Sequence, residues 1–181
     1  MQMRPAIQLQ SIMKSMKDTV LPAIDPTNKL AVEQGHIILG LLSIMSQRMD
    51  LEYRYDRDEL ARLLRFAELI QRQAQGGGDT RTALLDLKTV VAKGADVLDR
   101  ARAEPLELVR AVQSLRSRIG VVIQAVFSDG ASESKQALHE EVIANAREQL
   151  LRERSWLIMQ GWEANPAEVP PIESLISEVL S

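Results

Sequence analysis

The residues with the best spacing for chemistry are Glu33 and His36, three positions apart in the segment AVEQGHIILGLLSIM. A helical turn holds 3.6 residues, so a carboxylate and an imidazole at this spacing project from one side of a helix. Glu33 also shares a face with Ile37 and Ile44, which predicts that it points toward the interior. Together the two side chains could supply half of a metal site or an acid-base couple.

This spacing resembles the Glu-x-x-His motif of the ferritin-like di-iron carboxylate proteins, in which one helical turn supplies both groups to the same metal. The resemblance covers four residues, and it implies a second such motif and single glutamates from two other helices. The other histidine, His139, follows Gln136 at that spacing, and the first predicted helix contains no glutamate. We therefore name Glu33, His36 and His139 as the candidate metal ligands, but we interpret the pair as polar groups at the margin of a bundle. We predict no metal, no cofactor and no catalytic residue.

Other catalytic patterns are missing from the sequence. It has no Gly-x-Ser-x-Gly elbow, no phosphate-binding loop that ends in Gly-Lys-Ser/Thr, and no His-Glu-x-x-His. The loop GGGDT before a helix has the form of an anion cradle, but Asp79 would repel the anion. We interpret this loop as a flexible hairpin between helices, with Asp79 or Thr80 capping the helix that follows.

The composition favours helices. The chain has 181 residues, of which 45% are hydrophobic and only 3% aromatic. The apolar side chains are mainly Leu, Ile, Val, Ala and Met, and glycine and proline are few. We predict an all-α fold, an up-and-down antiparallel bundle of about six helices plus a short C-terminal helix. A single domain covers residues 1–181, with 164–181 as a C-terminal appendage.

Start and stop signals divide the chain. The first helix covers residues 5–20. The second begins after DPTN, where Asp25 can cap and Pro26 suits the first helical position, and it ends near Met49. The segment LEYRYD alternates and reads as an extended connector, after which Asp56 and Glu59 form a capping box for the third helix. The next helices are predicted at 82–103, 105–127 and from Ser132 to beyond Trp162, with a last short helix in IESLISEVL.

Three helices show apolar seams with steps of three and four residues, so they are predicted to pack as antiparallel neighbours. The seams are Leu60, Leu63, Ala67, Ile70 and Ala74; Leu84, Leu87, Val91, Gly94, Leu98 and Ala101; and Leu108, Val112, Leu115, Ile119, Val122 and Val126. Ala31 and Gly35 leave room for a second backbone against the second helix.

Charge and apolar run length limit the partners. The net charge is −3, and the arginine stripe of the third helix alternates with acids, as in the pairs Glu59–Arg62 and Glu68–Arg65 of a solvated face. We therefore expect no nucleic-acid partner. The run IILGLLSIM is too short to span a membrane. With no cysteine and no leader-like N-terminus, we expect a cytoplasmic protein.

The segment SWLIMQGW places apolar residues all around a helix, which predicts burial on every side. Trp156, Met159 and Trp162 suit either a dimer interface or an apolar pocket, and Met45 and Met49 could extend that surface. Our leading hypothesis is a noncatalytic protein that acts as a homodimer or as an accessory subunit of a protein partner. The alternative is a carrier or sensor of an apolar small molecule, with a pocket between the second and sixth helices. A Glu/His metal-dependent enzyme is the third hypothesis.

Overall fold

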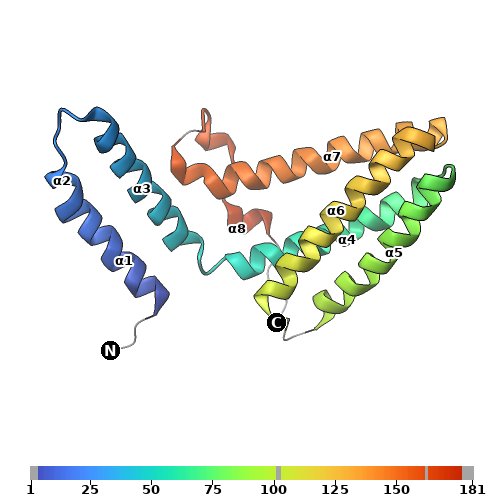
Figure 1. Cartoon of the computed structure of the whole chain (residues 1–181), viewed down its shortest axis with the longest axis horizontal. Coiled ribbons are helices and arrows are strands. Elements are labelled where there is room, and N and C mark those ends of the chain that lie inside the picture. The colour runs from blue at the N-terminus through green and yellow to red at the C-terminus, as the bar shows by residue number, and fades with distance from the viewer. Residues whose placement is uncertain (1–3, 101–102, 162, 177–181) are drawn as a thin grey trace. The chain divides into compact units, whose positions relative to one another are not determined.

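The computed structural model describes residues 4–100, 103–161 and 163–176 (Figure 1). Within these residues every regular element is a helix, and β geometry is confined to an isolated pairing of Gly76 with Gly130. This confirms the predicted all-α fold. In the same part of the chain, no helix combines the length and apolar character needed to cross a bilayer.

The elements follow one another in this order: α1 (Pro5–Ser15), a π-helical turn (Met16–Val20), α2 (Leu21–Ala23), α3 (Lys29–Arg48), α4 (Glu52–Gln73), α5 (Gly78–Asp99), α6 (Pro105–Asp129), α7 (Ser132–Leu157), short 3-10 turns at Ile158–Gln160 and Pro166–Glu168, and α8 (Ile172–Leu175).

Contacts divide the chain into two compact units. The first contains the described residues up to 52 together with those of 152–175, and the second contains those of 53–151 and Ile176. Helix α7 therefore contributes its last turns to the first unit and the rest to the second. This division does not test the prediction of one domain over residues 1–181 with 164–181 as an appendage, which stays a prediction.

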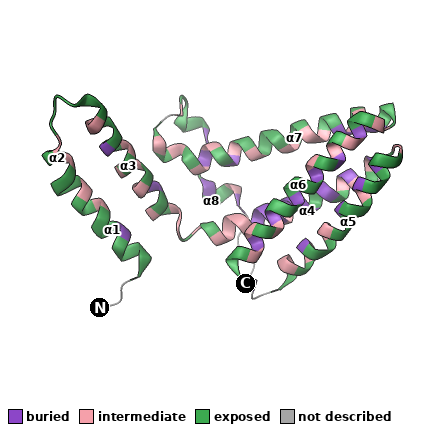
Figure 2. Cartoon of the chain, in the orientation of Figure 1, coloured by how far each residue is buried: buried purple, intermediate pink, exposed green. Residues whose placement is uncertain are grey.

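The second unit holds the main hydrophobic core, which α4, α5, α6 and α7 build together. Figure 2 shows its buried positions on the inner faces of these helices. The predicted α6 seam is confirmed, since all six of its residues are buried, and so are the five predicted for α4. In α5, Leu87 and Gly94 are buried and Leu84, Val91 and Leu98 are half-buried, while Ala101 lies outside the described residues.

Helix α4 begins earlier than predicted, at Glu52, so LEYRYD is helical and not an extended connector. The predicted capping box at Asp56 and Glu59 is also wrong, because both residues lie inside the helix. Tyr53 packs against the core, and the hydroxyl of Tyr55 accepts a hydrogen bond from Gln149 Nε2 at 3.4 Å. These contacts favour a helix over an extended chain.

Arg65 and Glu68 of α4 are exposed, as predicted for a solvated face. The predicted pair Glu59–Arg62 does not form. Both side chains are buried and reach other helices. Glu59 pairs with Arg116 of α6, and Arg62 Nη1 lies 2.7 Å from Glu148 Oε1 of α7. These charges therefore connect α4 to its neighbours.

The loop with three glycines packs against the α6–α7 loop. Gly77 N donates to Asp129 O at 3.1 Å, and Ala131 N donates to Gln75 O at 2.9 Å. The carboxylate of Asp129 accepts from Asp79 N at 2.9 Å and from Thr80 N at 3.2 Å. The predicted caps, Asp79 and Thr80, are therefore wrong, because the side chain of Asp129, the last residue of α6, already fills that place.

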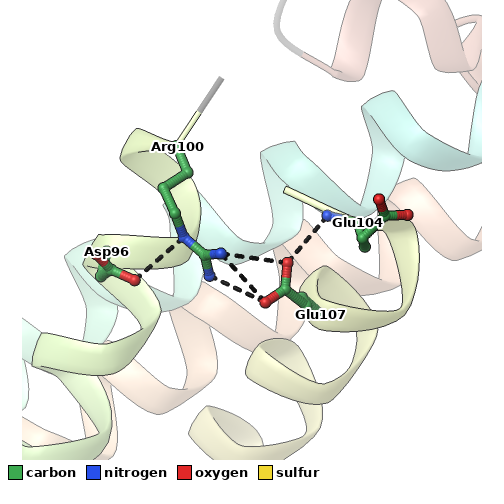
Figure 3. Close-up of polar contacts among 4 residues, drawn as sticks. All are labelled: Asp96, Arg100, Glu104 and Glu107. Atoms are coloured by element: carbon green, nitrogen blue, oxygen red, sulfur yellow. Dashed lines mark hydrogen bonds and ion pairs between the residues drawn. The ribbon is translucent and has the colours of Figure 1, made fainter. Parts of the chain in front are cut away.

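The predicted start of α6 after Glu104 is confirmed, whereas α5 ends at Asp99, before the predicted end at Ala103. Figure 3 shows the polar contacts between the two helix ends. Glu107 Oε2 accepts from Glu104 N at 3.0 Å, and Arg100 lies 3.1 Å from both Asp96 Oδ2 and Glu107 Oε1. The backbone N–H of Glu104, together with Arg100, holds the pKa of Glu107 below its usual value. This network closes the turn.

In the first unit, α1 and α3 form an antiparallel hairpin (Figure 1). Helix α3 begins at Lys29, and Asn28 Oδ1 caps it by accepting from Ala31 N at 3.1 Å. The predicted start after DPTN is confirmed, but the roles predicted for Asp25 and Pro26 are wrong, because both lie before the helix and Asp25 Oδ1 accepts from Thr27 N at 2.9 Å in a turn.

Candidate functional site

Helix α3 combines apolar character with exposure to solvent. From Gln34 to Gln47 it contains no Asp, Glu, Lys or Arg. Four large apolar side chains, at residues 30, 38, 41 and 45, fall within an arc of about 80° on the helix. Leu30 is 68% exposed, Ile38 45%, Leu41 46% and Met45 58%. We call these four residues the α3 stripe.

The opposite side of α3 packs within the hairpin. Gly35 is buried there, and a Cβ at that position would overlap Leu21 Cδ2. The expected close approach at Gly35 is thus made by a side chain of α2. Leu9 of α1 is also buried. Internal packing therefore uses this side and leaves the α3 stripe uncovered.

Two hollows lie beside the α3 stripe, where the end of α7 and the following turn approach α3. The Gly40 hollow has a volume of about 280 Å³ and is lined by His36, Ile37, Gly40, Leu41 and Gln160. The Trp156 hollow has a volume of about 250 Å³ and is lined by Ile44, Met45, Arg48, Met49, Glu52 and Trp156. Pockets for drug-sized ligands usually have volumes of about 300–1,000 Å³, so both hollows lie just below that range.

Arg48 fixes Trp156 against α3. Its Nη2 donates to Ser155 O at 3.2 Å and its Nε to Trp156 O at 3.3 Å. The guanidinium carbon lies 5.4 Å from the centre of the Trp156 ring, within cation-π range. Arg48 Nη1 also lies 3.7 Å from Glu173 Oε1. These contacts make one wall of the Trp156 hollow well defined.

The structure brings together three of the five residues predicted for an interface or pocket: Met45, Met49 and Trp156. Met159 is half exposed and lines neither hollow. Trp162 lies outside the described residues. The predicted burial on every side is wrong for this segment, because Leu157 and Met159 are exposed.

Glu33 is exposed, so the prediction that it points inward is wrong. Of the apolar residues on its face, Ile37 is half-buried and Ile44 is buried, so burial on this face lies further along α3 than Glu33. His36 is also exposed, and its Nδ1 lies 2.9 Å from Val32 O, which favours the tautomer with the proton on Nδ1. His139 is exposed on α7 in the second unit. Among the described residues, no three His, Asp or Glu side chains are grouped as metal ligands.

A third hollow, which the sequence analysis missed, lies between the start of the chain and α3. Its volume is about 670 Å³, and it is lined by Met13, Lys14, Lys17, Asp18, His36, Leu39, Gly40 and Ser43. Apolar side chains form its floor, and an ion pair of Lys14 with Asp18 lies at its rim. The π-helical turn that carries Lys17 and Asp18 has no clear sequence signal.

The comparisons with known proteins gave no match: no family model fits the chain, and neither the curated proteins nor the solved structures contain a similar one.

Proposed function

We propose that this protein is a noncatalytic helical protein that acts by self-association, and that the α3 stripe is its contact surface. The observation that carries the proposal is the charge-free exposed face of α3. A helix with one face in water normally places charged and polar residues there. Here large apolar side chains take those positions.

Size and chemistry also favour a protein partner over other ligands. Monomeric soluble proteins rarely expose a large contiguous apolar patch, and such patches commonly mark association sites. The two hollows beside the stripe are small, and a groove of this kind can accept the apolar face of a helix. The absence of charge along the stripe favours a partner surface that is also apolar.

Native mass spectrometry and sedimentation over a range of protein concentrations test this proposal. We expect a dimer that dissociates on dilution. Ile38→Glu should raise its dissociation constant at least tenfold, because a carboxylate would then be buried in an apolar contact. The control is Leu85→Glu, which changes an exposed leucine of α5 in the second unit and should leave the constant unchanged. A wild-type protein that stays monomeric at high concentration would refute the proposal.

The second candidate is a carrier of an apolar small molecule, and the hollow between α1 and α3 favours it. Its volume of about 670 Å³ lies within the usual range for ligand pockets. This is not the predicted position between the second and sixth helices, where the hollows are smaller. An additional mass from a bound small molecule, present in native mass spectra and lost in denaturing mass spectra, would support this candidate.

The remaining expectations stay proposals. We propose a cytoplasmic location, which suits a chain without cysteine, and no nucleic-acid partner, in keeping with the net charge of −3. Elemental analysis of purified protein tests the metal-dependent enzyme. Stoichiometric iron, manganese or zinc bound to Glu33 or His36 would favour it over association.

A further inference from the structure

We propose that two copies of the chain pair through α3 in antiparallel orientation, about a two-fold axis beside Leu41 and Leu42. The partner's Ile38 then enters the Trp156 hollow, and the partner's Met45 enters the Gly40 hollow. This inference rests on the proposed function and adds the occupant, the direction and the register of the contact.

The first argument is the spacing of the hollows. On α3 the Gly40 hollow is bounded by residues between His36 and Leu41, and the Trp156 hollow by residues between Ile44 and Met49. The midpoints of these two ranges of α3 are about eight residues apart, which is about 12 Å along a helix. A helix that fills both must therefore present two apolar side chains about two turns apart.

The second argument is that α3 itself carries such a pair. Ile38 and Met45 are both exposed and are seven residues apart, about 10 Å along the axis. A two-fold axis reverses the direction of the partner helix. With the axis near residue 42, position 38 of one copy falls opposite position 46 of the other, and position 45 falls opposite position 39. Both side chains therefore reach a hollow in the same register, and the surface is complementary to itself.

The third argument is Gly40, which no contact within the molecule explains. Apart from its chain neighbours and the backbone of its own helix, no atom of the described residues lies within 4 Å of the place where its Cβ would be. Gly35, in the same helix, is required by the packing of Leu21. A glycine inside a helix lowers helix stability, but it lets another chain approach the backbone closely. Gly40 lies about 120° around the helix from the middle of the α3 stripe, so it borders the inferred contact and leaves the Gly40 hollow open to the partner's Met45.

Single-cysteine cross-linking tests the register, because the chain has no cysteine of its own. In the inferred dimer, position 41 lies within about 3 Å of its copy along the helix axis, whereas position 30 lies about 36 Å from its copy. Treated with diamide, Leu41→Cys should form a disulfide-linked dimer rapidly. Leu30→Cys, at a position more exposed than Leu41, should not exceed Leu85→Cys, which reports random collision.

A second variant pair tests whether the Gly40 hollow must stay open for the partner's Met45. Gly40→Leu should keep the helical circular dichroism, since its side chain enters open space, and should raise the dimer dissociation constant at least tenfold. Gly120→Leu is the matched control, because Gly120 also lies inside a helix with nothing within 4 Å of its Cβ position. It should leave the constant unchanged. A Gly40→Leu protein that dimerises like the wild type would overturn the inference.

The outcomes separate this inference from the proposed function. A dimer that Leu41→Cys cross-links selectively supports both. A dimer in which Leu41→Cys behaves like Leu85→Cys overturns the antiparallel α3 pairing and leaves self-association in place. A wild-type chain that stays monomeric, or a stoichiometric complex with some other chain alone, overturns both.

Discussion

Asp129, the last residue of α6, caps α5 through its side chain. Its carboxylate accepts hydrogen bonds from the hydroxyl of Thr80 and from the amides of residues 79 and 80. The Thr80 hydroxyl is the main reason that the pKa of Asp129 lies below its usual value. The loop with three glycines thus does cradle an anion, but the anion belongs to the protein.

We expect Asp129→Ala to lower the melting temperature by several degrees, because the first amides of α5 lose their acceptor. Asp129→Asn keeps an acceptor oxygen and should have a smaller effect. Asp86→Ala removes only the exposed pair with Arg118 and should shift the transition by less than about one degree. Calorimetry of the three variants checks this, and equal transitions for Asp129→Ala and Asp86→Ala would contradict it.

Glu163 gives the first unit a dependence on pH. Arg154 binds both of its oxygens, at 2.8 and 2.9 Å, and the amide of Asn165 donates to it at 3.3 Å. Chiefly because of Arg154, the pKa of Glu163 falls from 4.5 to about 2. Because the pKa of Glu163 is lower in the folded than in the unfolded protein, its ionised form stabilises the fold at pH values above the unfolded-state pKa. This stabilisation is lost as the pH falls from 4.5 toward 2.

We therefore expect Glu163→Gln to be less stable than the wild type near neutral pH, with a difference that shrinks between pH 4.5 and 2. Arg154→Met should lose the same pH-dependent stability, because it removes the side chain that donates hydrogen bonds to Glu163. Melting temperatures measured across this range test the prediction. A constant difference between Glu163→Gln and the wild type at all pH values would exclude the ion pair as the cause.

These single-residue roles could not be predicted from the sequence, because they depend on which loops meet. Asp129 and the glycine loop are about 50 positions apart, as the hydrogen bond from Asp79 shows. Asp25 and Asn28 are both good caps by type, and only the geometry of the turn selects Asn28. Local sequence signals thus identify the residue types that can cap a helix, but they do not identify the hydrogen-bond partners in the folded protein.

At the scale of elements, Gly35 and Gly40 provide a paired test within one helix. Gly40→Ala should raise the free energy of unfolding of the monomer by about 0.5–1 kcal/mol, because alanine favours the helix and meets nothing. Gly35→Leu should lower it by about 1–3 kcal/mol, because its side chain overlaps Leu21. Urea unfolding at low protein concentration measures the change in unfolding free energy for each variant. If the two changes had the same sign, the close packing of Leu21 against Gly35 would be contradicted.

Helix α6 shows how far a local pattern reaches. Its apolar seam is continuous, so both the helix and its buried face could be predicted. Leu115→Ala should cost about 2–5 kcal/mol of unfolding free energy, whereas exposed Val121→Ala should cost less than about 0.5 kcal/mol. Chemical denaturation tests this difference.

The start of α4 could not be predicted, since the alternation in LEYRYD fits a strand, and only tertiary contacts of Tyr53 and Tyr55 favour the helix.

At the scale of the molecule, burial is unevenly divided between the two units. The large cluster of buried apolar residues lies entirely in the second unit. In the hairpin of α1 and α3, only Leu9 and Ile44 are buried large apolar residues. The sequence did not indicate this difference, because α3 is as apolar as a core helix and only its lack of apolar partners leaves it exposed. The same imbalance motivates the proposal that α3 is completed by a second copy.

Hydrogen exchange followed by mass spectrometry can test this imbalance directly. Backbone amides exchange when the structure around them unfolds locally, and segments with few buried contacts unfold most readily. We therefore expect α3 to exchange faster than α4 and α6 in dilute protein. Dimerisation should slow exchange in α3 as the concentration rises, because a ligand that binds only the closed form stabilises it. Peptides from α5 and α6 serve as internal controls and should not change with concentration. In Ile38→Glu the protection of α3 should no longer depend on concentration, and protection that appears in other helices while α3 stays unchanged would move the contact surface away from α3.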